Sequence, residues 1–178
     1  MIVLPGERIV LRALRLDELD IVSDSYLKAD YPLGGAKPPT RAQLRRRIER
    51  SGTLWNGKLD LGIEAGGRLV GDAGARAPRG AFPPDVFEIG VTLYDAAERG
   101  RGYGLEATKL VTNHLFAAEG AERVQATTAD WNAPMRRVLE ELGFVNEGTL
   151  RAFFPAEGGR DDYIMYALTR SDWTGNEL

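Results

Sequence analysis

The fold is decided by residues 86–119, which read VFEIGVTLYDAAERGRGYGLEATKLVTNHLFAAE. In residues 86–93 every second side chain is apolar, which is the pattern of a β-strand with one buried face. Residues 105–119 repeat apolar side chains at helical spacing, and Gly120 marks the end of that helix. The stretch therefore predicts a strand, a glycine-rich loop and a helix, in that order.

The strand has two different faces, because successive side chains point to opposite sides of a sheet. A glycine inside a strand often marks the close approach of a ligand or of another backbone, and Gly90 is such a glycine. The predicted core face holds Phe87, Ile89, Val91 and Leu93, and the predicted accessible face holds Glu88, Gly90 and Thr92.

The loop before the helix has the composition of an anion site. The first turn of a helix presents unpaired N–H groups and the positive end of the helix dipole. Glycines let backbone amides approach a phosphate closely, and arginines offer donors that suit phosphate oxygens. A plain loop with solvated arginines is the alternative, but the preceding strand favours a ligand that carries a diphosphate. The residues concerned are Arg99, Gly100, Arg101, Gly102, Tyr103, Gly104 and Leu105.

A second motif overlaps the loop. Residues 102–107, GYGLEA, also fit the G-x-G-x-x-A pattern of dinucleotide-binding proteins, and Asp130 ends the next predicted strand. A nicotinamide enzyme is therefore an alternative. Against it, residues 94–99 separate the strand from Gly100, and only one strand–helix–strand unit is present.

The other predicted elements extend outward from this unit without a repeat or a long linker, so we expect one domain over residues 1–178. They are a strand at 8–14, a helix capped by Asp17, a helix from Thr40 to about Ser51 with a Thr40/Gln43 capping box, a hairpin at 58–75 turning at Gly66–Gly67, a strand at 123–129, a short helix between Pro134 and Gly143, and strands at 144–154 and 161–169. The arginines of the second helix, Arg45, Arg46, Arg47 and Arg50, are interpreted as a solvated face.

Composition excludes several classes of protein. The 178 residues include 23 basic and 26 acidic side chains, a net charge of -3 that disfavours nucleic-acid or anionic-membrane partners. The absence of cysteine excludes disulfides and cysteine nucleophiles, and the single histidine, His114, cannot build a multi-histidine zinc site. We expect no metal. Because no apolar run is long enough to span a membrane, a cytoplasmic location is the default.

A family resemblance enters at the loop. Arg99-x-x-Gly102-x-Gly104 matches the Q/R-x-x-G-x-G/A acetyl-CoA motif of the GNAT superfamily of N-acetyltransferases. Further segments resemble its ribosomal-protein-alanine acetyltransferase (Rim-type) branch, in the same order along nearly the whole chain. They are GERIVLRAL (6–14), GRLVGDAG (67–74), EIGVTL (88–93), Asn132 with RRVLEELGFVNEGTLR (136–151), and DDYIMYALTRSDW (161–173).

The resemblance implies an α/β domain with a mixed, mostly antiparallel, splayed central sheet flanked by helices. It also implies acetyl-CoA as the cofactor, bound in the gap between the motif strand and the next one. By resemblance, amides of the loop hold the pyrophosphate, the backbone of Val91 to Leu93 and the side chain of Asn132 contact the pantetheine arm, and Arg137 meets a coenzyme A phosphate.

Family members transfer the acetyl group directly to an amine, so a group must remove a proton from the protonated amine. Our candidate is Glu88, acting as a proton acceptor through water. It lies about 16 Å back along an extended strand from Leu93, on the accessible face. The alternative is a solvated or salt-bridged carboxylate.

The sequence departs from the family pattern at the general acid. Leu139 stands where many relatives have a tyrosine, and Met135 where the Rim-type branch often has a serine. Tyr163 and Tyr166 are candidates, although tyrosines at strand spacing are more often core or interface residues. The departing thiolate can also take its proton from water.

These features predict an N-acetyltransferase that acts on the primary amine of a protein N-terminus, an amino sugar or a small metabolite. The second hypothesis is a non-catalytic acyl-CoA-binding or sensor domain. We expect the acceptor pocket between the two N-terminal helices and the loop before the last strand, and the resemblance implies a homodimer through the C-terminal strands.

Overall fold

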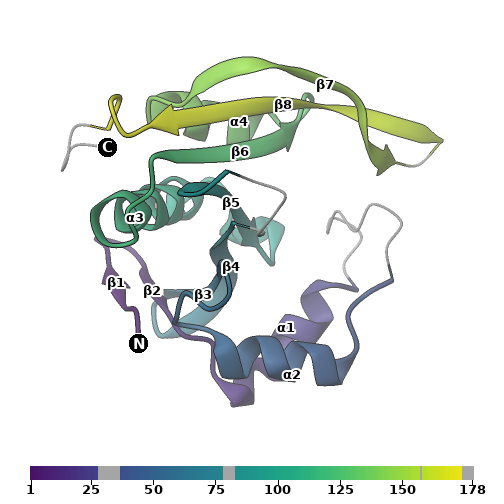
Figure 1. The fold of residues 1–178 in the computed structure, drawn as a ribbon. Helices are drawn as coiled ribbons and strands as arrows, with labels where there is room; N and C mark the ends of the chain where they lie inside the picture. Colours follow the sequence, from purple (N-terminus) through teal and green to yellow (C-terminus); the bar gives the residue numbers. More distant parts are fainter. Residues whose placement is uncertain (28–36, 78–82, 157, 174–178) are drawn as a thin grey trace.

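The computed structural model describes residues 1–27, 37–77, 83–156 and 158–173. Their strands are β1 (Leu4–Pro5), β2 (Val10–Arg12), β3 (Lys58–Ala65), β4 (Arg68–Arg76), β5 (Val86–Leu93), β6 (Arg123–Ala129), β7 (Val145–Ala156) and β8 (Gly159–Thr169). The helices are α1 (Leu19–Ser25), α2 (Arg41–Arg50), α3 (Tyr103–Ala118) and α4 (Ala133–Glu141), with short 3-10 turns at Leu16–Glu18 and Ala96–Glu98. The strands form one sheet in the order β1-β2-β3-β4-β5-β6-β8-β7 (Figure 1).

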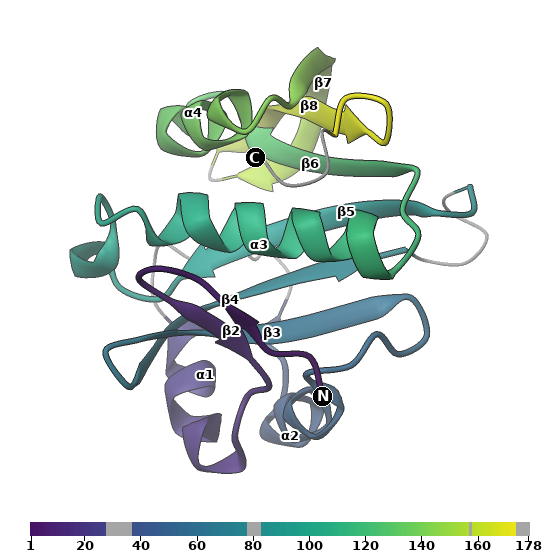
Figure 2. The same ribbon diagram turned by 90° about the vertical axis from the view of Figure 1, so that its left-hand side faces the viewer.

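Helices cover both faces of this sheet, α3 and α4 on one face and α1 and α2 on the other (Figures 1 and 2). The main core lies beneath α3 and α4, where Val111, Leu115 and Leu139 are fully buried. A smaller cluster that includes Val22 and Leu44 packs α1 and α2 against the opposite face. The α/β class and the flanking helices are as predicted.

The sheet is splayed at its only parallel pair among the described residues. All other neighbouring strands run antiparallel, whereas β5 pairs with β6 in parallel through Val86↔Arg123, Phe87↔Val124 and Glu88↔Gln125 only. Beyond those pairs β5 continues to Leu93 and β6 to Ala129, and the two strands diverge in Figure 1. The mixed, splayed sheet that the resemblance implied is confirmed.

Local signals at two turns are confirmed as well. The β3–β4 hairpin turns at Gly66 and Gly67, whose φ angles of 56° and 77° are the left-handed values that favour glycine. Helix α2 begins after Thr40, whose side chain accepts a hydrogen bond from the Gln43 N–H while the Gln43 side chain accepts one from the Thr40 N–H.

The N-terminal segment differs from the prediction. The strand expected at 8–14 covers only Val10–Arg12, because the Leu14 N–H donates to Ser51 Oγ (2.9 Å) instead of to a neighbouring strand. The prediction that Asp17 caps a helix is wrong, since Asp17 lies inside the 3-10 turn and is exposed. Glu18 stands at the N-cap position of α1 instead. Its carboxylate accepts hydrogen bonds from the Arg15 N–H (2.8 Å) and from the Arg12 side chain.

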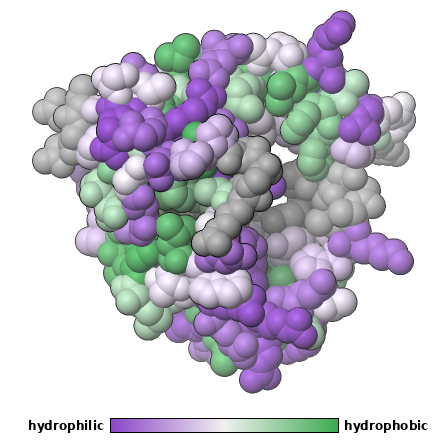
Figure 3. All heavy atoms as spheres, viewed as in Figure 1, coloured by the Kyte–Doolittle hydropathy of each residue, from purple (hydrophilic) through white to green (hydrophobic). Residues whose placement is uncertain are grey.

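The interpretation of the α2 arginines as a solvated face is wrong for Arg47. Arg45, Arg46 and Arg50 are exposed, and hydrophilic side chains dominate the lower part of the surface in Figure 3, which contains α1 and α2. Arg47 turns inward and donates to Asp60 Oδ1 (2.8 Å) and to Asp72 Oδ2 (3.0 Å). Burial alone would lower the pKa of Arg47, but the two carboxylates raise it above its ordinary value. Among the described residues, no helix is long and apolar enough to cross a membrane.

Candidate active site

The glycine-rich loop places a row of free amides at the start of α3. Gly100 and Gly102 have φ angles of 74° and 80°, and Gly102 is the N-cap of the helix. The first helical bond runs from the Glu106 N–H to the Gly102 carbonyl oxygen. Within the described part of the chain, the N–H groups from Gly100 to Leu105 have no acceptor. A row of free donors at a helix N-terminus is the arrangement that suits a diphosphate, the ligand that the sequence analysis expects here.

One of the two arginines of the loop makes contacts within the loop itself. Arg101 folds back on the loop, donating from Nε to the Ala97 carbonyl oxygen (3.1 Å) and lying 3.7 Å from Glu98 Oε2. Its guanidinium is therefore partly engaged by the loop itself, although its backbone amide belongs to the free row. Arg99 is exposed.

A cation that the sequence analysis missed lies beside the loop. The Arg8 N–H donates to Glu106 Oε1 (3.0 Å), and a Cβ built on Gly102 would lie 3.3 Å from Arg8 Nη1. Arg8 comes from the turn between β1 and β2, far from the loop in the chain. No local pattern links the two segments, so only the fold reveals this contact.

The divergence of β5 and β6 exposes the edge of β5. Beyond Glu88 the edge that faces β6 has no ladder partner among the described residues, so the backbone of Val91 and Leu93 is free on that side. The side chains of Val91 and Leu93 pack against the main core, as predicted. Gly90 is exposed, and a Cβ built there would meet no described atom within 4 Å. The free edge therefore belongs to β5, and the free amides lie in the loop that follows the same strand.

Glu88 lies at the point where the two strands stop pairing. Its carboxylate accepts a hydrogen bond from Arg76 Nη2 at 2.5 Å, across the β4–β5 pair. The Glu88 side chain is 13% exposed, whereas that of Arg76 is 63% exposed. Glu88 lies on the strand face opposite Phe87 and Ile89, as predicted, but its side chain is only partly accessible. The ion pair with Arg76 is a contact that the sequence analysis left open.

Asn132, which follows β6, has a structural role that the sequence analysis did not assign. Its Oδ1 atom accepts a hydrogen bond from the Met135 N–H (3.3 Å) and so caps α4. The amide nitrogen of the side chain is not used by this cap. Arg137 is exposed on α4, and Leu139 is fully buried in the core.

The two tyrosines offered as general acids are held by their surroundings. Tyr166 is fully buried, and its hydroxyl donates to Glu140 Oε1 (2.8 Å) and accepts from Arg136 Nε. Burial raises the pKa of Tyr166 despite the hydrogen bond from Arg136. Burial and the charge of Asp161 raise the pKa of Tyr163, whose ring packs near Phe154.

The family follows from a match over most of the chain. The family model described as an acetyltransferase (GNAT) domain matches residues 8–145, a range that includes the loop, β5, β6 and α4. The chain belongs to the GNAT acetyltransferases. The match favours the acetyl-CoA interpretation of the loop over the nicotinamide one.

Individual relatives of this GNAT domain align with parts of it. An uncharacterized N-acetyltransferase from the SPbeta prophage of Bacillus subtilis, YokL, is 32% identical over 44% of this chain and 44% of its own length. The [ribosomal protein uS5]-alanine N-acetyltransferase of Escherichia coli is 28% identical over 53% of this chain and 58% of its own length. The alignments thus span about half of these relatives.

The fold of the GNAT domain recurs in solved structures. Mycobacterium smegmatis RimJ, solved in complex with CoA-disulfide, superposes with a TM-score of 0.74 at 24% identity, covering 93% of this chain and 84% of that chain. The splayed sheet and its helices are therefore a shared architecture.

Proposed function

We propose that this protein is an acetyl-CoA-dependent N-acetyltransferase that transfers the acetyl group directly to a primary amine in a ternary complex. The observation that carries the proposal is the row of free N–H groups from Gly100 to Leu105, at the end of a strand whose edge is free beyond Glu88. A diphosphate satisfies those donors, and the free strand edge suits the amide-containing pantetheine arm.

Each cofactor contact assigned to this chain has a structural reason. The amides of residues 100–105 hold the pyrophosphate at the positive end of α3. Arg8 adds a cation beside Gly102. The exposed side chains of Arg99 and Arg137 are the proposed contacts of coenzyme A phosphate oxygens. The free amide nitrogen of Asn132 is available to the arm. Bound acetyl-CoA supplies an activated thioester.

Glu88 is the proposed proton acceptor. Its carboxylate, held by Arg76, is positioned to accept a proton from the ammonium group of the acceptor, directly or through water. A backbone amide of the free β5 edge is available to stabilise negative charge on the acyl oxygen. Neither Tyr163 nor Tyr166 is assigned as the general acid, and water is the proposed source of the proton for the thiolate.

The acceptor class is a primary amine, and a protein or peptide N-terminus is supported by the name of the Escherichia coli relative, an alanine N-acetyltransferase of a ribosomal protein. A cytoplasmic location and a homodimer through the C-terminal strands stay part of this proposal. The non-catalytic sensor is the weaker hypothesis, because the relatives are named as N-acetyltransferases.

The test measures acetyl-CoA binding and thiol release with a panel of peptides, amino sugars and small amines. Release of coenzyme A together with an N-acetylated product is the expected result. Binding of acetyl-CoA without thiol release on any amine would contradict transfer and favour the sensor.

A further inference from the structure

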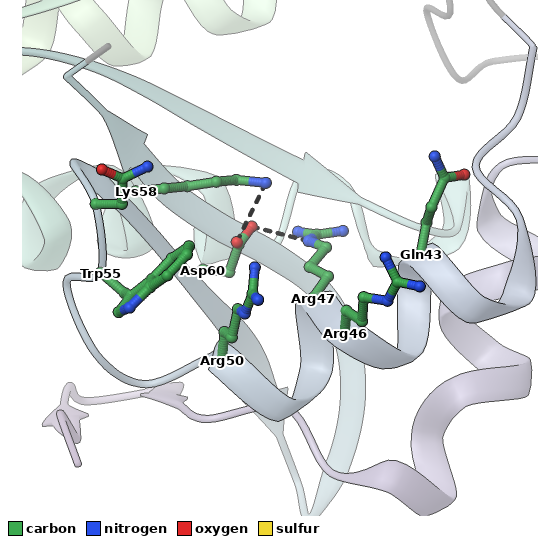
Figure 4. Close-up of a pocket in the computed structure, with 8 residues that line it drawn as sticks. Gln43, Arg46, Arg47, Arg50, Trp55, Lys58 and Asp60 are labelled. Atoms are coloured by element: carbon green, nitrogen blue, oxygen red, sulfur yellow. Dashed lines mark hydrogen bonds and ion pairs between the residues drawn. The ribbon is translucent and has the colours of Figure 1, made fainter. Parts of the chain in front are cut away.

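A basic pocket lies on the sheet face covered by α2. It has a volume of about 350 Å³ and opens between α2 and the turn that leads into β3 (Figure 4). Its walls include Arg46, Arg47 and Arg50 from α2, together with Trp55, Lys58 and Asp60.

Positive charge in this pocket exceeds its negative charge. Arg47 is neutralised by Asp60 and Asp72, and Lys58 Nζ lies 3.3 Å from Asp60 Oδ2. Arg46 pairs with no acid among the described residues, and Arg50 lies over the exposed Trp55 ring at 4.1 Å without an acidic partner there. An anion that enters the pocket would therefore meet unpaired guanidinium groups.

The pocket is separate from the site proposed for the diphosphate. Lys58 pairs across the sheet with Arg76, which pairs with Glu88, so the pocket lies level with the first half of β5. The glycine-rich loop follows Leu93, roughly 16 Å further along an extended strand. One coenzyme diphosphate cannot occupy both places.

One row of paired residues links the pocket to the proposed transfer site. Asp60 pairs with Gly74, and Gly74 pairs with Gly90, so these three residues form a row across β3, β4 and β5 on one face. Two strand spacings separate Asp60 from Gly90, a distance of about 10 Å.

We infer that the acceptor amine belongs to a molecule that carries a carboxylate about 10 Å from the reacting nitrogen, and that this pocket binds the carboxylate. The inference rests on the proposed function and narrows its substrate class. In a peptide N-terminus the distance corresponds to an acidic side chain near the third residue, and in a small molecule to the far end of a linear ω-amino acid.

The experiment compares matched acceptors with wild-type protein, Arg46→Gln and Arg45→Gln. One pair of peptides differs only in Asp or Asn at the third position, and one small-molecule pair consists of a linear ω-amino acid and its primary amide. Arg45 is the control, because it is the neighbouring arginine of α2, pairs with Glu49 and does not line the pocket. Transfer is measured as kcat/KM, and binding of each acceptor is measured calorimetrically.

The wild-type protein is expected to prefer the acidic member about tenfold in kcat/KM, and Arg46→Gln to reduce that preference about fivefold while Arg45→Gln leaves it unchanged. If the preference appears in the peptide pair, the carboxylate belongs to a peptide. If it appears in the ω-amino acid pair, the carboxylate belongs to a small molecule. Equal transfer to both members of both pairs contradicts the proposal that the pocket binds a carboxylate. It does not contradict the proposed acetyl transfer. Selective binding of an acidic acceptor without thiol release on any amine supports the pocket and contradicts the proposed function.

Discussion

The chemistry assigned to Glu88 depends on two neighbours. Arg76 binds the Glu88 carboxylate at 2.5 Å. Gln125 of β6 is the residue paired with Glu88 in the last register pair before β5 and β6 diverge. The contact with Arg76 uses the Oε1 atom of the carboxylate and holds the side chain in place. The divergence leaves Glu88 beside the free strand edge. A salt bridge and a catalytic role are therefore compatible at this position.

Replacing Glu88 by Gln removes the proton acceptor and keeps the shape of the side chain. We expect kcat to fall about 100-fold near neutral pH, while the Kd for acetyl-CoA stays unchanged. Steady-state kinetics across pH and calorimetric titration measure the two quantities. Glu147→Gln is the control, because Glu147 also forms an ion pair, with Arg123, but lies on β7. Equal turnover of Glu88→Gln and wild type at every pH would remove the role.

At the scale of residues, sequence reasoning succeeds where the signal is local. The alternation of β5 places Glu88 and Gly90 on the accessible face. The contacts of Arg8 with the loop and of Arg47 with Asp72 join segments far apart in the chain, and no periodicity encodes them. Arg101 illustrates a different limit, since its Nε donates to the Ala97 carbonyl oxygen, a local contact that no sequence pattern indicates.

Helix α4 combines stability and binding in one residue. Asn132 caps the helix with its Oδ1 atom, and its amide nitrogen is the group proposed to contact the pantetheine arm. Aspartate is as good an N-cap as asparagine but has no amide nitrogen to donate, whereas alanine can do neither.

Two substitutions at Asn132 separate these roles. Asn132→Asp should leave the free energy of unfolding within a few tenths of a kcal/mol of wild type and raise the KM for acetyl-CoA. Asn132→Ala should raise that KM as well and lower the free energy of unfolding by about 1 kcal/mol. Denaturant unfolding and kinetics measure the two effects. If Asn132→Asp has the wild-type KM, the proposed contact is wrong.

Glu18 stabilises the 3-10 turn that leads into α1. Burial alone would raise the pKa of Glu18, but hydrogen bonds from Arg12 and from the Arg15 N–H lower it below its ordinary value. A carboxyl group whose pKa is lowered in the folded state stabilises the protein at every pH above its ordinary pKa. That contribution is lost as the pH falls through the pKa of the folded state.

Glu18→Gln should therefore lower the free energy of unfolding by about 2 kcal/mol near neutral pH. The difference from wild type should shrink on acidification from about pH 6 to about pH 3. Urea unfolding at a series of pH values measures it, with the exposed neighbour Asp17→Asn as control. A difference that is constant across this range would contradict the pKa argument.

Most elements are predictable from sequence, and their misplaced ends have physical causes. The capping box of α2 and the Gly66–Gly67 turn are encoded within a few residues, so both are predicted correctly. The 3-10 turn at Ala96–Glu98 has too few residues to show a periodicity. The strand predicted at 8–14 is too long, because the hydroxyl of Ser51 takes the N–H of Leu14.

At the scale of the whole molecule, the site depends on a sheet that is incomplete in its middle. The pairing of β5 with β6 stops at Glu88, and a Cβ at Gly90 beyond it would meet no described atom within 4 Å. The sequence alone suggests a close approach at Gly90, but only the resemblance to a family implies the divergence of the strands. The length of a parallel ladder depends on both strands and on the helices that pack against them.

A side chain at Gly90 should abolish function and spare the fold. Gly90→Val should keep the free energy of unfolding of the wild type, since an added Cβ meets no atom of the described residues within 4 Å. It should lower kcat/KM at least about 100-fold by filling the gap. Gly74→Val is the contrast, because its Cβ would lie 2.3 Å from the Leu59 carbonyl oxygen and should destabilise the protein. Full activity of folded Gly90→Val would show that the gap is not the transfer site.

The measurement that tests the central claim most directly follows the backbone amides of the glycine-rich loop by NMR during titration with acetyl-CoA. The account predicts that the N–H resonances of residues 100–105 shift strongly and saturate together, because these donors gain the oxygens of the diphosphate. The amides of the β3–β4 turn at Gly66 and Gly67, also exposed, serve as the internal reference. Saturable binding of acetyl-CoA that leaves residues 100–105 unmoved would contradict it.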